Sequence, residues 1–250
     1  VELLHTATLV HDDVVDESLE RRGFFSINAL WKNKIAVLVG DYLLSKGLLL
    51  STEAQDFKHL QILSQAVKKM SEGELLQIEK ARKLNLKEDI YFEIIKNKTA
   101  SLLSSACGVG AWSTTKNELI TVKMQSFGEK VGIAFQIKDD LFDYGKEDIG
   151  KPTGNDIKEK KLTLPLIYTL NAVDPDKRRE MIYIIKNQNK NPKKIKVVLD
   201  AVTASGGIKY TIQKMFWYRD EALSILYEFE DSEIRKGLEE LVRFTTDRKY

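Results

Sequence analysis

The scarcity of helix-breaking residues is the feature that most constrains the fold of this chain. Only four of its 250 residues are proline, and the dominant residues Leu, Ile, Lys, Glu and Ala are good helix formers. Apolar residues make up 43% of the chain and charged residues 30%, which is ordinary globular composition. We therefore expect an all-α protein, a bundle of long helices joined by short loops, that folds as a single domain over residues 1–250.

Charge and cysteine content argue against several classes of protein. The net charge of +2 is spread evenly along the chain, which gives no electrostatic reason to expect a nucleic-acid partner. Cys107 is the only cysteine, so an internal disulfide and a thiolate metal cluster are both excluded, and we expect a reducing compartment, the cytoplasm. Asp41 and Lys46 interrupt the most apolar stretch, residues 35–50, so we expect a buried core helix there and no transmembrane segment.

Hydrophobic periodicity predicts where the helices lie. We expect a loop and a short helix over residues 17–33, and longer helices over about 1–16, 34–52, 58–83, 87–113, 117–144 and from 163 onward. Asn117 and Pro165 mark two of the helix starts, one as a side-chain cap and the other as a first-turn proline. The chain opens directly in a helical pattern, without a cap or a signal-like segment, which we interpret as a fragment that lacks its N-terminal helices.

An acidic cluster lies at the end of the first predicted helix. Within the stretch His11-Asp12-Asp13-Val14-Val15-Asp16, the carboxylates of Asp12 and Asp16 stand one helical turn apart and point the same way. Their mutual repulsion favours a bound cation, and hard oxygen ligands suit Mg²⁺, which usually retains waters and substrate phosphates. A solvated acidic helix end explains one isolated D-D-x-x-D pattern equally well.

A second acidic cluster repeats this spacing near the end of a helix that we predict to be long and mostly buried. It contains Asp139, Asp140 and Asp143. Carboxylates are rarely buried unless they are paired or coordinated, and aspartates near a helix C-terminus oppose the macrodipole. The two clusters together therefore predict facing helices that hold metal ions and a polyanion between them.

Basic residues that could bind phosphate accompany the aspartates. They are Arg21, Arg22, Lys98, Lys151 and Lys161. Arginine grips phosphate oxygens in pairs and lysine acts as a point charge, although each of these residues taken singly is ordinary surface. Aspartates, Mg²⁺ and phosphate binders together indicate diphosphate chemistry, in which catalysis must stabilise charge on the leaving group.

Motifs that span nearly the whole chain form an ordered set. They are residues 5–16 (HTATLVHDDVVD) with Arg21-Arg22-Gly23, Gly40-Asp41, Gly73-Glu74, Lys98-Thr99, residues 136–143 (QIKDDLFD), Gly150-Lys151, Gly154-Asn155-Asp156 and residues 160–165 (KKLTLP). This set resembles the trans-isoprenyl (polyprenyl) diphosphate synthase family. The resemblance implies the isoprenoid synthase fold, helices around a central cavity, and a homodimeric prenyltransferase. Such an enzyme condenses isopentenyl diphosphate head-to-tail with an allylic diphosphate to give a trans-polyprenyl diphosphate.

The resemblance also implies roles for individual residues. Asp12, Asp16 and Asp139 would ligate a three-ion Mg²⁺ centre on the allylic diphosphate, with Asp13, Asp140 and Asp143 as outer ligands or orienting groups. Lys98 and Lys161 would act with these ligands in catalysis. The residues implied to hold the allylic substrate are Arg21, Lys98, Thr99, Gln136, Lys151 and Lys161. His5 and Arg22 would contact isopentenyl diphosphate, whereas the family's upstream Gly-Gly-Lys/Arg motif does not occur in this sequence.

Small residues precede the first acidic cluster where the growing tail would run. Ala7 and Thr8 stand there, whereas short-chain members of the family tend to have aromatic residues, so the resemblance implies a medium or long product. The apolar helix around Leu43 and Leu48 could supply a dimer interface, although burial in the core explains it equally well.

Three rival functions fit parts of these patterns. A terpene cyclase would share the fold and the first motif, but it would carry an Asn/Asp, Asp, Ser/Thr and Glu motif in place of the second D-D-x-x-D. A non-catalytic subunit of a heteromeric synthase would keep the fold and lose metal ligands, all of which are present here. A plain helical interaction module gives no account of the paired clusters.

Overall fold

The protein is a bundle of helices, as expected from its scarcity of helix breakers. The computed structural model describes residues 1–21, 23–83, 87–145 and 154–248. The helices are α1 (Glu2–Val15), α2 (Ile27–Glu53), α3 (Phe57–Lys83), α4 (Glu88–Ile95), the π-helical turn η1 (Lys96–Ala100), α5 (Ser101–Thr115), α6 (Glu118–Phe142), α7 (Asn155–Lys158), α8 (Leu164–Ala172), α9 (Pro175–Asn187), α10 (Pro192–Ala204), α11 (Gly207–Leu226) and α12 (Glu233–Asp247). The prediction of an all-α fold is confirmed.

A small antiparallel hairpin links α1 to α2. Strand β1 (Glu20–Arg21) pairs with β2 (Phe24–Phe25), with Glu20 opposite Phe25. The sequence patterns predicted a loop in this segment and gave no indication of the strands. The hairpin places Arg21 next to the C-terminal end of α1, where the first acidic cluster lies.

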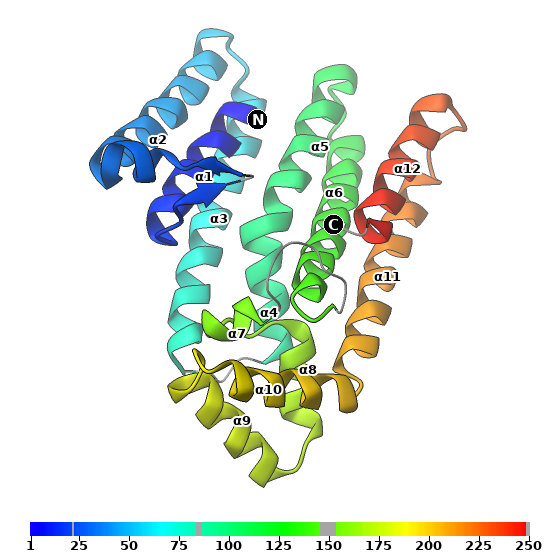
Figure 1. Ribbon diagram of the computed structural model, residues 1–250. Helices are drawn as coiled ribbons and strands as arrows, with labels where there is room; N and C mark the ends of the chain where they lie inside the picture. Colours follow the sequence, from blue (N-terminus) through cyan, green and yellow to red (C-terminus); the bar gives the residue numbers. More distant parts are fainter. Residues whose placement is uncertain (22, 84–86, 146–153, 249–250) are drawn as a thin grey trace.

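Helix α6 runs through the centre of the bundle. Figure 1 shows α1, α2 and α3 on one side, α5 and α6 in the middle, α11 and α12 on the other side, and α7 to α10 across one end. A large apolar core joins α6 to the helices at that end, with Ile137, Leu166 and Met181 among its fully buried members. A second core packs Phe127 and Val131 of α6 against α11 and α12. Helix α6 is therefore packed against its neighbours both in its middle and toward its C-terminal end.

Local sequence signals mark several helix starts. The Asn117 side chain accepts hydrogen bonds from the backbone N–H groups of Leu119 (2.9 Å) and Ile120 (3.2 Å), which confirms the predicted cap of α6. Pro165 lies in the first turn of α8, where its missing N–H is not needed. The predicted short helix before residue 34 is also confirmed, because Lys32 (φ 68°, ψ 163°) interrupts α2.

The expectation of a buried helix over residues 35–50 is wrong. Leu38 is 63% exposed and Tyr42 is 66% exposed, whereas the buried side of this helix includes Ala36 and Gly40. A Cβ on Gly40 would lie 2.3 Å from His11 Nε2, so α2 approaches α1 closely through one narrow face. By length and composition α2 could span a membrane, but core helices and signal sequences meet the same criterion, so no transmembrane segment is established.

The helix predicted over residues 87–113 contains a π-helical turn. Turn η1 joins α4 to α5 and lies between two glycines of neighbouring helices. A Cβ on Gly73 of α3 would lie 2.7 Å from Lys98 N, and a Cβ on Gly132 of α6 would lie 2.5 Å from Ala100 Cα. Because π-helical turns are rare and occur frequently at functional sites, this turn indicates that Lys98 and Thr99 belong to such a site.

Candidate active site

The first aspartate cluster (Asp12, Asp13 and Asp16) lies at the C-terminal end of α1. Burial raises the pKa of Asp12 above its ordinary value. The Lys98 ammonium opposes this increase, whereas the carboxylates of Glu74 and Asp16 add to it. Asp12 is therefore within electrostatic reach of α3 and η1, and its charge is only partly compensated.

Asp13 points away from Asp12 and Asp16 and into the protein. Its side chain is buried, and its Oδ1 accepts hydrogen bonds from Arg21 Nε (2.9 Å) and Arg21 Nη2 (2.7 Å). The Asn28 side chain donates to the Asp13 backbone carbonyl (3.2 Å). These contacts fix the guanidinium of Arg21 beside the cluster and favour an orienting role for Asp13.

Lys98 of η1 forms an ion pair with Glu74 of α3. The neighbouring Thr99 hydroxyl donates to Gln136 Oε1 of α6 (2.7 Å). The π-helical turn thus brings a cation and a hydroxyl, which are adjacent in sequence, into contact with two different helices. Glu74 had no predicted role, although the Gly73-Glu74 motif contains it.

The second aspartate cluster (Asp139, Asp140 and Asp143) lies at the C-terminal end of α6, and its carboxylates have different partners. Asp139 pairs with Arg248, which follows α12. Asp140 is buried, and burial raises its pKa to about 6, although hydrogen bonds from Tyr91 (2.7 Å) and Gln136 (2.9 Å) oppose the increase.

Asp143 holds the start of α7. Its carboxylate accepts hydrogen bonds from the backbone N–H groups of Asn155 (2.8 Å) and Asp156 (3.1 Å). Burial raises the pKa of Asp143, and these hydrogen bonds oppose that shift. In this arrangement Asp143 ties the end of α6 to the segment that leads to Lys161.

Lys161 connects the two clusters electrostatically. Burial lowers its pKa, but carboxylates from both clusters and from α7 raise it above its ordinary value; they belong to Asp156, Glu159, Asp140 and Asp16. Asp156, which had no predicted role, is itself affected: burial raises its pKa to about 8, the Asp140 carboxylate adds to the increase, and Lys161 opposes it. Carboxylates at the ends of α1 and α6 thus both contribute to the raised pKa of Lys161, and the convergence of the two clusters on one metal centre stays a prediction.

Several predicted site residues lie apart from these contacts or outside the described residues. His5 lies two turns before Asp12, with Nδ1 3.8 Å from Glu2 Oε2, and Thr8 donates to the His5 carbonyl (2.8 Å). Ala7 is buried. Arg22 and Lys151 lie outside the described residues.

The arrangement of carboxylates fits a cation that arrives together with a phosphate. Among residues 1–21, 23–83, 87–145 and 154–248, no three acidic, histidine or cysteine side chains form a ready-made metal cage. Mg²⁺ typically binds one or two carboxylates and completes its shell with waters and substrate phosphates. Asp12 and Asp16, whose carboxylates repel each other, supply suitable oxygen ligands.

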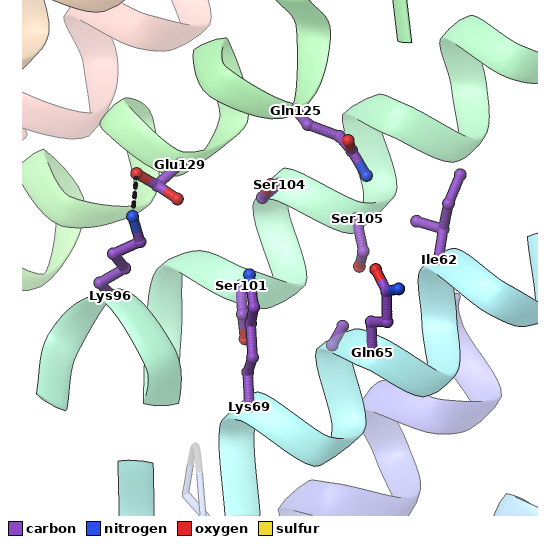
Figure 2. A pocket seen from close by; sticks show the side chains of 10 residues that line it. Ile62, Gln65, Lys69, Lys96, Ser101, Ser104, Ser105, Gln125 and Glu129 are labelled. Atoms are coloured by element: carbon purple, nitrogen blue, oxygen red, sulfur yellow. Dashed lines mark ion pairs between the residues drawn. The ribbon is translucent and has the colours of Figure 1, made fainter. Parts of the chain in front are cut away.

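A separate small cavity lies between α3, α5 and α6. Figure 2 shows that Gln65, Lys69, Ser101 and Gln125 line it, with the pair formed by Lys96 and Glu129 (2.9 Å) at one side. Its volume of about 30 Å³ admits ordered water but no diphosphate. The predicted site residues do not line this cavity, so it does not compete with the aspartate clusters as the active site.

Tyr91 and Arg248 are partners of the aspartates that the sequence patterns did not indicate. Tyr91 lies two helical turns before Lys98, a spacing that places both residues on one side of a helix, and this spacing could have revealed it. Arg248 lies more than a hundred positions from Asp139 in the sequence, and no local pattern connects the two.

The chain is similar to polyprenyl synthetases in sequence and in structure. The polyprenyl synthetase family model matches residues 1–202. Octaprenyl diphosphate synthase of Escherichia coli (strain K12) is 35% identical over 253 residues, which cover 99% of this chain and 77% of the relative. A decaprenyl diphosphate synthase structure from Rhodobacter capsulatus superposes with a TM-score of 0.94 at 37% identity, covering 100% of this chain and 77% of that chain. A Caulobacter crescentus CB15 polyprenyl synthase complexed with calcium and isoprenyl diphosphate gives a TM-score of 0.90 at 35% identity, covering 100% and 76%.

Proposed function

The chain belongs to the polyprenyl synthetase family and is a trans-prenyl diphosphate synthase, and we propose that its reaction is Mg²⁺-dependent and takes place between α1 and α6. It condenses isopentenyl diphosphate head-to-tail with an allylic diphosphate. The octaprenyl and decaprenyl relatives support a product of medium or long chain length. The observation that carries the placement of the site is the hydrogen-bonded contact of Thr99 with Gln136 and of Gln136 with Asp140, which brings the turn of Lys98 beside the second cluster.

Asp12, Asp16 and Asp139 are the proposed Mg²⁺ ligands. The ion would neutralise negative charge on the diphosphate and so make it a better leaving group. The Caulobacter crescentus polyprenyl synthase, which is complexed with calcium and isoprenyl diphosphate, supports a role for a divalent cation in this chain. Asp13, Asp140 and Asp143 orient the protein groups that contact them, because each already accepts hydrogen bonds from such groups.

The cations of the site hold the allylic diphosphate and stabilise the charge that develops as it departs. Lys98 and Lys161 are the proposed catalytic cations; Arg21, Thr99, Gln136 and Lys151 complete the substrate contacts. Departure of the diphosphate leaves an allylic carbocation, and the double bond of isopentenyl diphosphate attacks it. The adduct then loses a proton to the departing diphosphate. His5 and Arg22 are assigned to the isopentenyl diphosphate side on the family pattern alone.

We also propose a homodimer that forms through α2 and acts in the cytoplasm. Exposed apolar side chains on this helix include Leu38, Tyr42 and Leu49, and contiguous apolar surface of this kind typically marks an interface. The lone thiol of Cys107 supports a reducing compartment, because nothing in the sequence could pair with it inside the chain.

Release of diphosphate from a labelled allylic substrate tests the proposed function. The expected result is turnover that requires Mg²⁺ and falls about 100-fold or more in Asp12→Ala, because the variant loses stabilisation of the leaving group. Asp176→Ala is the matched control, since this exposed carboxylate lies on α9. Turnover that persists in Asp12→Ala, or in the presence of a chelator, contradicts the proposal. If turnover requires Mg²⁺ and Asp12, the sizes of the products made from farnesyl and geranylgeranyl primers define the chain length.

A further inference from the structure

A continuous chain of hydrogen bonds joins three helical segments beside the proposed metal ligands. Thr99 Oγ1 of η1 donates to Gln136 Oε1 of α6 (2.7 Å), and Gln136 Nε2 donates to Asp140 Oδ1 (2.9 Å). The Tyr91 hydroxyl of α4 donates to Asp140 Oδ2 (2.7 Å). The chain therefore runs from the π-helical turn, across α6, to α4.

The geometry of this chain leaves its members little freedom. The Gln136 amide oxygen accepts from the Thr99 hydroxyl and the amide nitrogen donates to the Asp140 carboxylate. Rotation of the amide by half a turn would set its oxygen against that carboxylate, which can only accept, and would break the contact. Each oxygen of Asp140 accepts one hydrogen bond. Asp140 is 7% exposed and Tyr91 is 3% exposed, so water cannot readily replace the Tyr91 hydroxyl as a donor to Asp140.

The position of Tyr91 separates it from the substrate. Its ring packs in the apolar core that contains Ile137 and forms a T-shaped pair with the ring of Phe92, with 5.3 Å between the centroids. The hydroxyl is the end of the side chain that approaches the site, and Asp140 occupies it. Any effect of Tyr91 on the reaction must therefore pass through Asp140.

We propose that Tyr91 is a positioning residue that couples the metal-binding end of α6 to the phosphate-binding turn η1; this inference rests on the proposed function. Asp140 is adjacent to Asp139, so the anchor provided by Tyr91 fixes the last turn of α6 and the direction of the proposed ligand. Through Gln136 the same anchor holds Thr99, and with it the backbone of Lys98. Loss of the Tyr91 hydroxyl leaves one buried carboxylate oxygen without a donor and loosens both halves of the site together.

Tyr210 of α11 offers a matched control, because its partner Glu88 lies on α4, the helix of Tyr91. Its hydroxyl donates to Glu88 at the start of α4, at 2.7 Å and 2.9 Å, so Tyr210→Phe also deletes a bond between a tyrosine and a carboxylate. Glu88 lies at the N-terminal end of α4, and its partners include Tyr210 and Lys214 of α11. A purely structural role for Tyr91 predicts that the two phenylalanine variants behave alike.

The test measures binding of inorganic pyrophosphate in the presence of Mg²⁺ by titration calorimetry, together with kcat and KM. We expect Tyr91→Phe to weaken Mg²⁺-dependent pyrophosphate binding about tenfold to a hundredfold and to lower kcat, the range found when groups that orient metal ligands are removed. The KM for isopentenyl diphosphate should stay unchanged, and Tyr210→Phe should bind pyrophosphate like the wild type. Equal binding by Tyr91→Phe and Tyr210→Phe would overturn the inference.

A second variant keeps the test decisive if Tyr91→Phe does not fold. Gln136→Met breaks the chain at its centre with little change in volume, and it should weaken pyrophosphate binding in the same way. In the double variant the effect of Tyr91→Phe should shrink, because the coupling to η1 is already lost. If the wild-type protein itself fails to bind pyrophosphate with Mg²⁺, the proposed function and this inference both fall. If the wild type binds and all variants match it, only the inference falls.

Discussion

Replacing Gly132 with alanine tests whether a close helix contact holds the π-helical turn in place. A Cβ at this position would lie 2.5 Å from Ala100 Cα and 2.8 Å from Ala100 Cβ. Both atoms belong to a fully buried residue of η1, so no side-chain rotation can relieve the overlap. The turn that carries Lys98 and Thr99 must instead move away from α6.

The expected loss of stability combines two opposing terms. Overpacking of a close contact costs about 1–3 kcal/mol, whereas alanine in place of glycine within a helix gains about 0.5–1 kcal/mol. Because the overlap involves backbone, the cost should lie toward its upper limit, which leaves a net loss of about 2 kcal/mol. For a chain of this size such a loss lowers Tm by about 4–8 °C. A displacement of η1 should also raise the KM for the allylic diphosphate about tenfold.

Gly110→Ala is the matched control, because Gly110 lies within α5 and a Cβ added there would have no described heavy atom within 4 Å beyond its own helix backbone. It should raise the stability by about 0.5–1 kcal/mol through helix propensity alone. Thermal unfolding followed by circular dichroism and steady-state kinetics with the allylic substrate provide the two measurements. A Tm for Gly132→Ala at or above that of Gly110→Ala, with an unchanged KM, would refute the reasoning.

Three further predictions follow from other parts of the molecule. Thr8→Phe should shorten the main product more than Ala7→Phe does, because Thr8 lies one turn before Asp12 whereas Ala7 is buried; equal product lengths by mass spectrometry would count against it. Leu38→Glu should halve the mass in sedimentation without loss of helicity, since it charges the exposed face of α2; an unchanged mass excludes that face as the interface. Burial raises the pKa of Cys107 to about 11, so its thiol is almost fully protonated at pH 8. Alkylation there should be at least about tenfold slower than in urea, and equal rates would disprove the shift.

Helix positions could be predicted from the sequence because their signals are local. Asn117 caps α6 with its own side chain, and Pro165 suits the first turn of α8 whatever lies around it. The break in α2 at Lys32 is also visible in the sequence, because polar residues there separate two helical patterns. Such features depend only on residues within a few positions along the chain, so the sequence alone is enough to predict them.

The environment of a helix could not be predicted in the same way. An apolar stretch such as residues 35–50 has the composition of a core helix, but its burial depends on which elements pack against it. The π-helical turn is similar, because the close contacts from Gly73 and Gly132 come from other helices. The resemblance to the family therefore implied Lys98 and Thr99 as site residues but gave no indication of the turn that positions them.

The geometry of a helix explains why the two D-D-x-x-D motifs divide their carboxylates. Positions i and i+4 share one face, whereas position i+1 is turned by about 100°. The middle aspartates of the motifs, Asp13 and Asp140, accordingly point into the protein and are 5% and 7% exposed. This division could have been deduced from the spacing alone, and it predicts that each middle aspartate needs a protein partner.

The two middle aspartates are satisfied by different chemistry. Asp13 receives two hydrogen bonds from a guanidinium, which keeps a positive charge beside the first cluster. Asp140 receives one hydroxyl and one amide, both neutral, at the end of the helix where the macrodipole is negative. The positive charges that compensate the second cluster therefore come from outside α6, namely from Lys161, Arg248 and the proposed cation. Arg21 hydrogen-bonds Asp13 and leaves Asp12 and Asp16 for the cation, so we expect both clusters to respond to the arrival of Mg²⁺ with diphosphate.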